Sequence, residues 1–253
     1  MCGDKVSASG YPWLFRGLGN SCWALETTLE HHYPAKWSLL SYYKRVLAAK
    51  PAIEAFSGRR WRVPDLPALE ESIRKTIETC KSPHQVLTKL PDVYEYLVYL
   101  RHHGFPSPLL DWTASPYVAA FFAFDEVAKN TDRVCVYAAK GLFSGNAEFF
   151  ELVGPHMTTH ERHFLQQGWY SYSVKMNPPS ADWVFWPHEQ VIAADSGKPV
   201  HDRLLKFTIP ASERRLVLQH LDLMNINPFS LFKSEDSLVR TTARRECGYS
   251  ETF

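Results

Sequence analysis

The chain has 253 residues, of which 45% are hydrophobic, and this is enough apolar material for one sizeable core. Lys and Arg number 28 against 27 Asp and Glu, so no overall charge steers the chain towards nucleic acid or an anionic membrane. Any contact with a nucleic acid would have to be local.

The chain shows no signal for a membrane or for an oxidising compartment. No apolar run reaches the ~20 residues of a membrane span, and the first residues lack the apolar core of a signal peptide. The five cysteines form no CxxC pair, which argues against a disulfide framework and a zinc site. We therefore expect a single cytoplasmic domain over residues 1–253, with no bound metal.

The first predicted strand, residues 11–15, is aromatic and apolar and ends at Arg16. Gly17 and Gly19 follow directly. An arginine offers a planar fork of donors and glycine lets the backbone approach a ligand, so this strand end suits a phosphate or pyrophosphate. The alternative is an exposed arginine in a turn.

Apolar residues at helical spacing predict helices over about residues 34–50, 66–80 and 90–103. We expect these helices to form an inserted bundle, about residues 34–103, beside a sheet. The loop Ser57–Arg62 is basic and aromatic. It either grips a nucleic-acid backbone and stacks a base or, as we prefer, is a solvated turn anchored by Trp61.

The stretch from Tyr99 to Phe124 organises the rest of the chain. Gly104 and the prolines after it predict a stiff turn, and Ser115 followed by Pro116 predicts the start of a helix. Four polar side chains lie between two apolar blocks and form a candidate site: His102, Asp111, Thr113 and Ser115. Alternatively, the hydroxyls only satisfy backbone groups.

The second half of the chain predicts more strands than helices. Glu161, Arg162 and Gln166 precede a strand at its rim, where loops present chemistry. The Pro- and Trp-rich segment 177–199 is predicted to be a loop that covers the site, and residues 142–151 are ambiguous. The remaining predictions are strands over 133–138, 168–174 and 204–209, and helices over 212–225 and 234–245.

Three motifs in this order resemble the FRG domain family. They are Phe15-Arg16-Gly17, then Gly104-Phe105-Pro106 leading to Leu109-Leu110-Asp111-Trp112-Thr113 and Ser115-Pro116, then Arg162 with Gln166 and Gly168. The resemblance spans roughly residues 11–231. The chain departs from the family pattern at Arg101-His102-His103-Gly104, where the family shows Gln-His-Tyr-Gly, and at Ser107-Pro108, where it shows Thr-Arg.

A weaker resemblance links the same order of motifs to the arginine, serine, glutamate scheme of ADP-ribosyltransferases. It implies an α+β fold with a mixed or antiparallel split sheet of that type, interrupted by the helical bundle, with NAD as a substrate in its cleft. It assigns NAD binding to Arg16, Gly17, His102, Asp111, Thr113 and Ser115, and catalysis to Arg16, Glu161, Arg162 and Gln166.

The third motif departs from the transferase scheme. Cleavage of the nicotinamide bond leaves a cation-like ribose, which a carboxylate would stabilise. The scheme places that carboxylate where this chain has Arg162, with Glu161 one residue earlier. This role has three alternatives: Glu161, a later carboxylate such as Glu235, or no residue at all.

The sequence therefore supports two main hypotheses. The first is an enzyme that transfers ADP-ribose from NAD to RNA, DNA or protein, with the Arg59–Arg62 loop favouring a nucleic acid, and that would act as a toxin or anti-phage effector. The resemblance leaves open whether an antitoxin partner exists. The second is a non-catalytic module that binds a nucleotide or a partner. A hydrolase using His102, Asp111 and a serine is a third, weaker alternative because no GxSxG turn is present.

Overall fold

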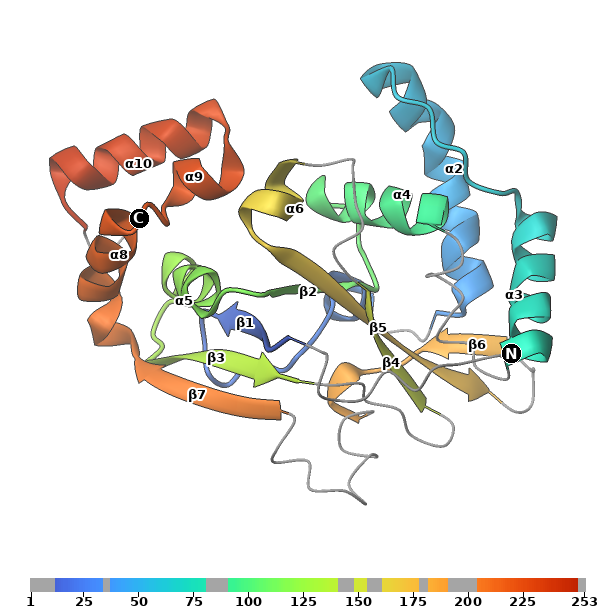
Figure 1. The fold of residues 1–253 in the computed structure, drawn as a ribbon, viewed down its shortest axis with the longest axis horizontal. Helices are drawn as coiled ribbons and strands as arrows, with labels where there is room; N and C mark the ends of the chain where they lie inside the picture. The colour runs from blue at the N-terminus through green and yellow to red at the C-terminus, as the bar shows by residue number, and fades with distance from the viewer. Residues whose placement is uncertain are drawn as a thin grey trace.

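The computed structural model describes residues 12–33, 37–80, 91–140, 148–153, 161–177, 182–190 and 204–249. Its centre is a seven-stranded antiparallel sheet in the order β4-β5-β2-β1-β3-β7, with β6 also paired to β5 (Figure 1). The strands are β1 (Leu14–Leu18), β2 (Leu110–Thr113), β3 (Arg133–Ala139), β4 (Glu148–Val153), β5 (Gly168–Asn177), β6 (Asp182–Phe185) and β7 (Leu204–Pro210).

The sheet is irregular at two places. β2 pairs with the first part of β5 and β6 with its last part, so both lie on the same edge of that strand. β1 pairs with β3 along its whole length but with β2 only where Phe15 lies opposite Thr113. Beyond this pair β1 and β2 diverge, which opens the middle of the sheet.

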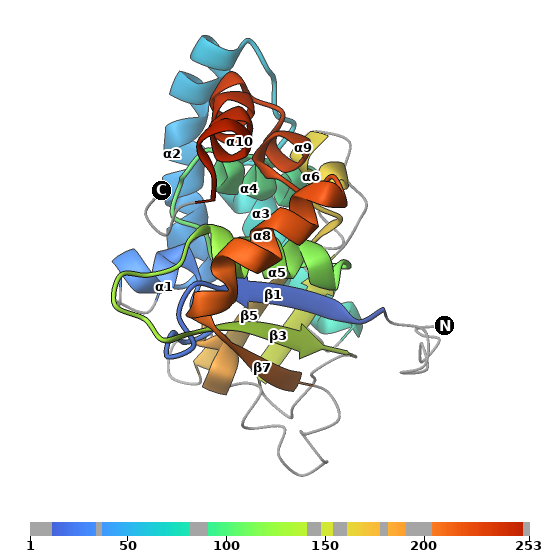
Figure 2. The same cartoon turned by 90° about the vertical axis from the view of Figure 1, so that its left-hand side faces the viewer.

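Helices cover one face of the sheet in two groups. Over β5 and β6 lie α2 (Leu39–Ser57), α3 (Leu66–Cys80) and α4 (Pro91–His102), and over β1 and β3 lie α5 (Pro116–Asp125) and α8 (Arg214–Leu223) (Figures 1 and 2). The latter group continues into α9 (Pro228–Phe232) and α10 (Glu235–Cys247), and the other short helices are α1 (Thr28–His32) and α6 (Glu161–Leu165).

Alternation along the strands separates two cores. Tyr170, Tyr172 and Val174 of β5 face the helices, while Trp169 packs on the opposite face with Leu14 and other apolar side chains. This agrees with the alternation expected from the sequence. Aromatic side chains are therefore buried on both faces of the sheet.

The predicted helices and strands are largely confirmed. Ser115 caps α5 by accepting from the Val118 N–H, with Pro116 in the first turn, and Ser234 caps α10. Gly104 has a φ of 83°, as its predicted turn requires. The short helix α9 was not predicted, and residues 142–147 lie outside the described residues.

The first strand differs from its prediction. β1 runs from Leu14 to Leu18, so Arg16 lies in its middle and not at its end. Gly17 is a packing glycine: a Cβ there would overlap the Ala119 carbonyl oxygen of α5. Gly19 meets the Glu126 carbonyl in the same way. The glycines that suggested a phosphate turn instead let α5 pack directly on the strand backbone.

Of two loop predictions, the turn anchored by Trp61 is confirmed and the covering loop changes. Trp61 is only 8% exposed, and Arg60 forms an ion pair with Glu54, so residues 58–62 are a turn anchored by a buried indole that has no free face for a base. The segment predicted to cover the site contains β6, whose Trp183 is buried in the core, and residues 178–181 and 191–199 of it lie outside the described residues.

The structure also bears on the thiols and on membrane crossing. The cysteines whose side chains are described, Cys22, Cys135 and Cys247, are free thiols. Within the described part of the chain, no helix combines the length and apolar character that a membrane crossing requires.

We predict that Gly17→Ala lowers the free energy of unfolding by about 3 kcal/mol, because the new methyl group forces α5 away from β1. Gly58→Ala is the control: Gly58 has a φ of 70° and open space around it, so only backbone strain of about 1 kcal/mol is expected. Chemical denaturation measures both. Equal losses for the two variants would contradict the close packing of α5.

Candidate functional site

A cleft of about 710 Å³ opens where β1 and β2 diverge. Its walls come from both helical groups: Arg101 and His102 of α4, Ala119 and Phe122 of α5, and Phe232 of α9. Clefts of ~300–1,000 Å³ are typical of sites for small molecules and cofactors. The cleft joins segments that are far apart in the sequence.

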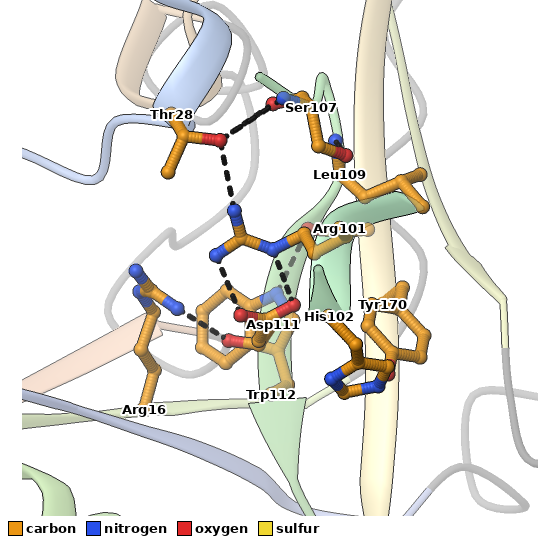
Figure 3. A network of polar contacts seen from close by, with 10 residues as sticks. Arg16, Thr28, Arg101, His102, Ser107, Leu109, Asp111, Trp112 and Tyr170 are labelled. Carbon is orange, nitrogen blue, oxygen red and sulfur yellow. Dashed lines mark hydrogen bonds and ion pairs between the residues drawn. The ribbon is translucent and has the colours of Figure 1, made fainter. Parts of the chain in front are cut away.

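An ion pair forms the floor of the cleft (Figure 3). Arg101, at the end of α4, donates from Nε to Asp111 Oδ1 at 2.7 Å and from Nη2 to Oδ2 at 2.6 Å. Its third nitrogen, Nη1, donates to Thr28 Oγ1 at 2.9 Å, and the same hydroxyl oxygen accepts the Ser107 N–H at 3.0 Å. One guanidinium thus joins α4, β2, α1 and the turn before β2.

Charge stabilises both members of this pair. Burial alone would raise the pKa of Asp111, but Arg101 and Arg16 outweigh it and hold that pKa below its usual value. Burial would likewise lower the pKa of Arg101, and Asp111 reverses the effect. The Asp111 side chain is 43% exposed, so the carboxylate is open to the cleft although both its oxygens are engaged.

Arg16 enters the cleft from β1. It lies on the same face of the strand as the core residues Leu14 and Leu18, so burial lowers the pKa of its guanidinium to about 10. Its Nη1 donates to the Asp111 backbone carbonyl at 2.8 Å, which bridges the gap between the diverging strands. Its Nε is buried and has no hydrogen-bond partner among the described residues.

His102 and the hydroxyls have mainly structural partners. His102 Nε2 lies 2.8 Å from the Tyr170 hydroxyl. Burial raises the pKa of that hydroxyl. Thr113 Oγ1 donates to the Gln166 carbonyl at 2.7 Å and accepts the Ser115 N–H at 3.1 Å. Thr113 thus ties β2 to the turn before β5, and both hydroxyls satisfy backbone groups, as the alternative interpretation expected.

The third motif contributes a wall of the cleft but no carboxylate. Arg162 and Gln166 line the cleft, and they donate to the Phe232 and Leu231 carbonyls at 3.3 and 3.1 Å. These are the last carbonyls of α9, which have no partner within that helix. Glu161 is exposed on α6 and does not line the cleft, and neither does Glu235.

Sequence reasoning missed several residues of the cleft. Arg101 was noted only as a departure from the family pattern, and its partner lies ten residues away on another element. Glu126, at the end of α5, and Trp23, in the loop after β1, also line the cleft. Thr27 and Glu30 form a capping box that fixes α1, a signal that could have placed Thr28.

A hydrogen-bonded chain supports the floor from the other side of the sheet. Trp112 Nε1 donates to Ser171 Oγ at 2.8 Å, and the same hydroxyl lies 3.1 Å from His188 Nε2. His188 is 1% exposed, and burial lowers its pKa to about 3. A neutral imidazole is therefore part of the folded structure at neutral pH.

The geometry argues against the hydrolase alternative. Both Asp111 oxygens are engaged by Arg101, and no serine is among the cleft-lining residues of the described ranges, which leaves a His102–Asp111 hydrolase without a nucleophile. The described residues also contain no group of three or more His, Cys, Asp or Glu that could hold a metal ion.

The fold and the cleft define an α+β protein with a ligand-sized site between two helical groups of one sheet face. The family model of the FRG domain matches residues 11–132. The matched part of the chain supplies β1, β2 and most of the floor of the cleft. The third motif lies beyond the matched residues. No curated protein and no solved structure matches the chain.

We predict that His188 makes the protein less stable in acid. The unfolded chain binds a proton on this residue below its ordinary pKa of 6.5, whereas the folded protein does not until about pH 3. Stability is therefore lost as the pH falls from 6.5, by about 2 kcal/mol at pH 5. Urea unfolding at pH 8 and pH 5 measures this loss.

His188→Gln should remove this acid-dependent loss of stability, because an amide does not titrate. His220→Gln, at an exposed position, should retain the loss. The same pH dependence in wild type and His188→Gln would show that His188 is not buried in its neutral form.

Proposed function

We propose that the cleft binds NAD and that the protein is an ADP-ribosyltransferase-like enzyme, which cleaves NAD and transfers ADP-ribose to a macromolecule. One observation carries the proposal: the three motifs of the transferase scheme, which are far apart in the sequence, contribute Arg16, Thr113 and Gln166 to one cleft. That cleft opens at a divergence in an antiparallel sheet, as a split-sheet transferase would require.

Arg16 is the residue best suited to the NAD pyrophosphate. With a pKa of about 10 it remains a cation at neutral pH, although it is half-buried. Only one of its nitrogens has a hydrogen-bond partner in the described structure, and the rest of the guanidinium is turned away from Asp111 (Figure 3). A planar fork of unused donors in a cleft favours an anionic oxygen.

The carboxylate that NAD cleavage needs would come from a wall of the cleft other than the one formed by the third motif. Glu26 and Glu126 are exposed carboxylates in the cleft, and Glu126 is close enough to Arg16 to act on its pKa. Asp111 is already committed to Arg101. We therefore assign to Glu126 the stabilisation of the cation-like ribose, in place of Glu161.

The structure constrains the macromolecule that accepts ADP-ribose less than it constrains the NAD site. Because Trp61 is buried, the Arg59–Arg62 loop offers a nucleic acid exposed arginines but no ring on which a base could stack. RNA, DNA and protein are therefore tested on equal terms. A transferase acting on any of these in a host cell would serve as a toxin or anti-phage effector, and a cell that makes it would need an antitoxin.

A second candidate is a module that binds NAD or ADP-ribose without turnover. It is favoured by the third motif, where Arg162 lines the cleft at the position that the scheme gives to a carboxylate. A cation there opposes development of positive charge on the ribose. The two candidates share the ligand and differ in nicotinamide release.

We predict that the purified protein releases nicotinamide from labelled NAD, and that total cell protein, RNA or DNA takes up the label. Arg16→Met should reduce the release by about 100-fold or more, because a fixed donor to the ligand is lost. Its thermal stability should change little, since one hydrogen bond contributes only about 1 kcal/mol. Arg133→Met, at an exposed arginine that does not line the cleft, is the matched control.

The outcomes separate the candidates. No nicotinamide release in any mixture, combined with a rise in melting temperature on adding ADP-ribose, would select the binding module. Neither release nor a thermal shift would reject both. Unfolding of Arg16→Met would assign Arg16 a structural role.

We predict that Glu126→Gln lowers nicotinamide release by about 100-fold while ADP-ribose still binds, because the carboxylate acts on the transition state more than on the bound ligand. Glu161→Gln should leave the rate unchanged, since Glu161 lies outside the cleft lining. The reverse result would return the catalytic assignment to Glu161 and show that α6 turns inward when NAD is bound.

A further inference from the structure

Trp23 is a large aromatic residue that does not belong to the hydrophobic core. Its side chain lines the cleft and is 46% exposed. In the described part of the chain its indole has no ring contact and no hydrogen bond from its N–H. What sets this indole apart from other exposed aromatic residues is its place in the cleft, where its π face can contact a ligand.

The loop that carries Trp23 is fixed on both sides. Before it, the Ser21 N–H donates to the Arg133 carbonyl at 2.8 Å; after it, Leu25 is 1% exposed and its N–H donates to Glu189 Oε1 at 3.0 Å. Gly19 packs directly on the Glu126 backbone. The exposed indole is therefore presented by an anchored loop and not by a loose end.

The neighbours of Trp23 indicate the kind of ligand. Trp23 and Arg16 belong to one continuous segment, β1 and the loop that leaves it, and both line the cleft. A flat π surface together with a guanidinium suits a nucleotide, whose base stacks on an aromatic ring while its phosphates meet the cation. A purely apolar ligand would offer no acceptor to the guanidinium donors of Arg16 that have no partner in the described structure.

We propose that Trp23 forms the base-stacking subsite of the cleft, where it binds the heteroaromatic ring of a nucleotide whose phosphates lie on Arg16. The inference rests on the proposed function, because the nucleotide is taken to be NAD. It goes beyond that function by assigning the ring to the α1 side of the cleft. Adenine and nicotinamide share the flat π face that the indole requires, and the ligands below distinguish them.

Calorimetric titration with NAD, ADP-ribose and nicotinamide mononucleotide tests the subsite. Trp23→Ala should weaken the binding of NAD by about tenfold or more, which is the loss typical of one stacked base. Trp23→Phe should retain most of the affinity. If Trp23→Ala also loses affinity for ADP-ribose, adenine lies on Trp23. If it loses affinity for nicotinamide mononucleotide, nicotinamide lies there. Phe56→Ala, at a 97% exposed aromatic residue outside the cleft, is the control.

The failures are distinguishable. If wild-type protein binds NAD and both Trp23→Ala and a second variant, Trp23→Gln, bind it equally well, the stacking subsite is rejected and the proposed function stands. If wild-type protein binds none of the three ligands, both proposals are rejected. A melting curve for each variant confirms that the compared proteins are folded.

Discussion

The cleft depends on the ion pair between Arg101 and Asp111. Opposite charge stabilises this carboxylate, and two parallel hydrogen bonds from Arg101 fix its orientation. The same arginine holds Thr28, and through it the turn at Ser107. Four segments that approach the cleft from different directions therefore share one electrostatic centre. A cleft built in this way can keep its shape without a ligand.

The pair is also a particular feature of this chain. Arg101 stands where the FRG pattern resembled by the sequence has a glutamine, and Pro108 stands where that pattern has an arginine. A glutamine at position 101 could donate to a carboxylate but could not neutralise it. The charge balance inside the cleft of this chain therefore depends on Arg101 as well as on Asp111.

Local signals in the sequence predicted most of the elements and part of the site. Ser115 with Pro116 fixed the start of α5, and alternation in β5 identified its two faces correctly. The glycine after Arg16 was misinterpreted, because a packing glycine and a turn glycine look the same until the opposing helix is known. The partners of Arg162 and Gln166 are backbone carbonyls of α9, and no sequence pattern reveals them. Ion pairs and side-chain contacts to backbone need the tertiary fold; capped helices do not.

The antiparallel order of the sheet sets a limit on how this protein can be divided. The residues matched by the FRG family model end at Asp132, just before β3, and β5 lies still later in the chain. A fragment cut at that point would leave β1 without its full-length neighbour, and β2 without the strand that pairs with it. Two open strand edges in the middle of a former sheet invite association with other chains. The residues matched by the family model therefore stop short of the strands that complete the sheet around β1 and β2.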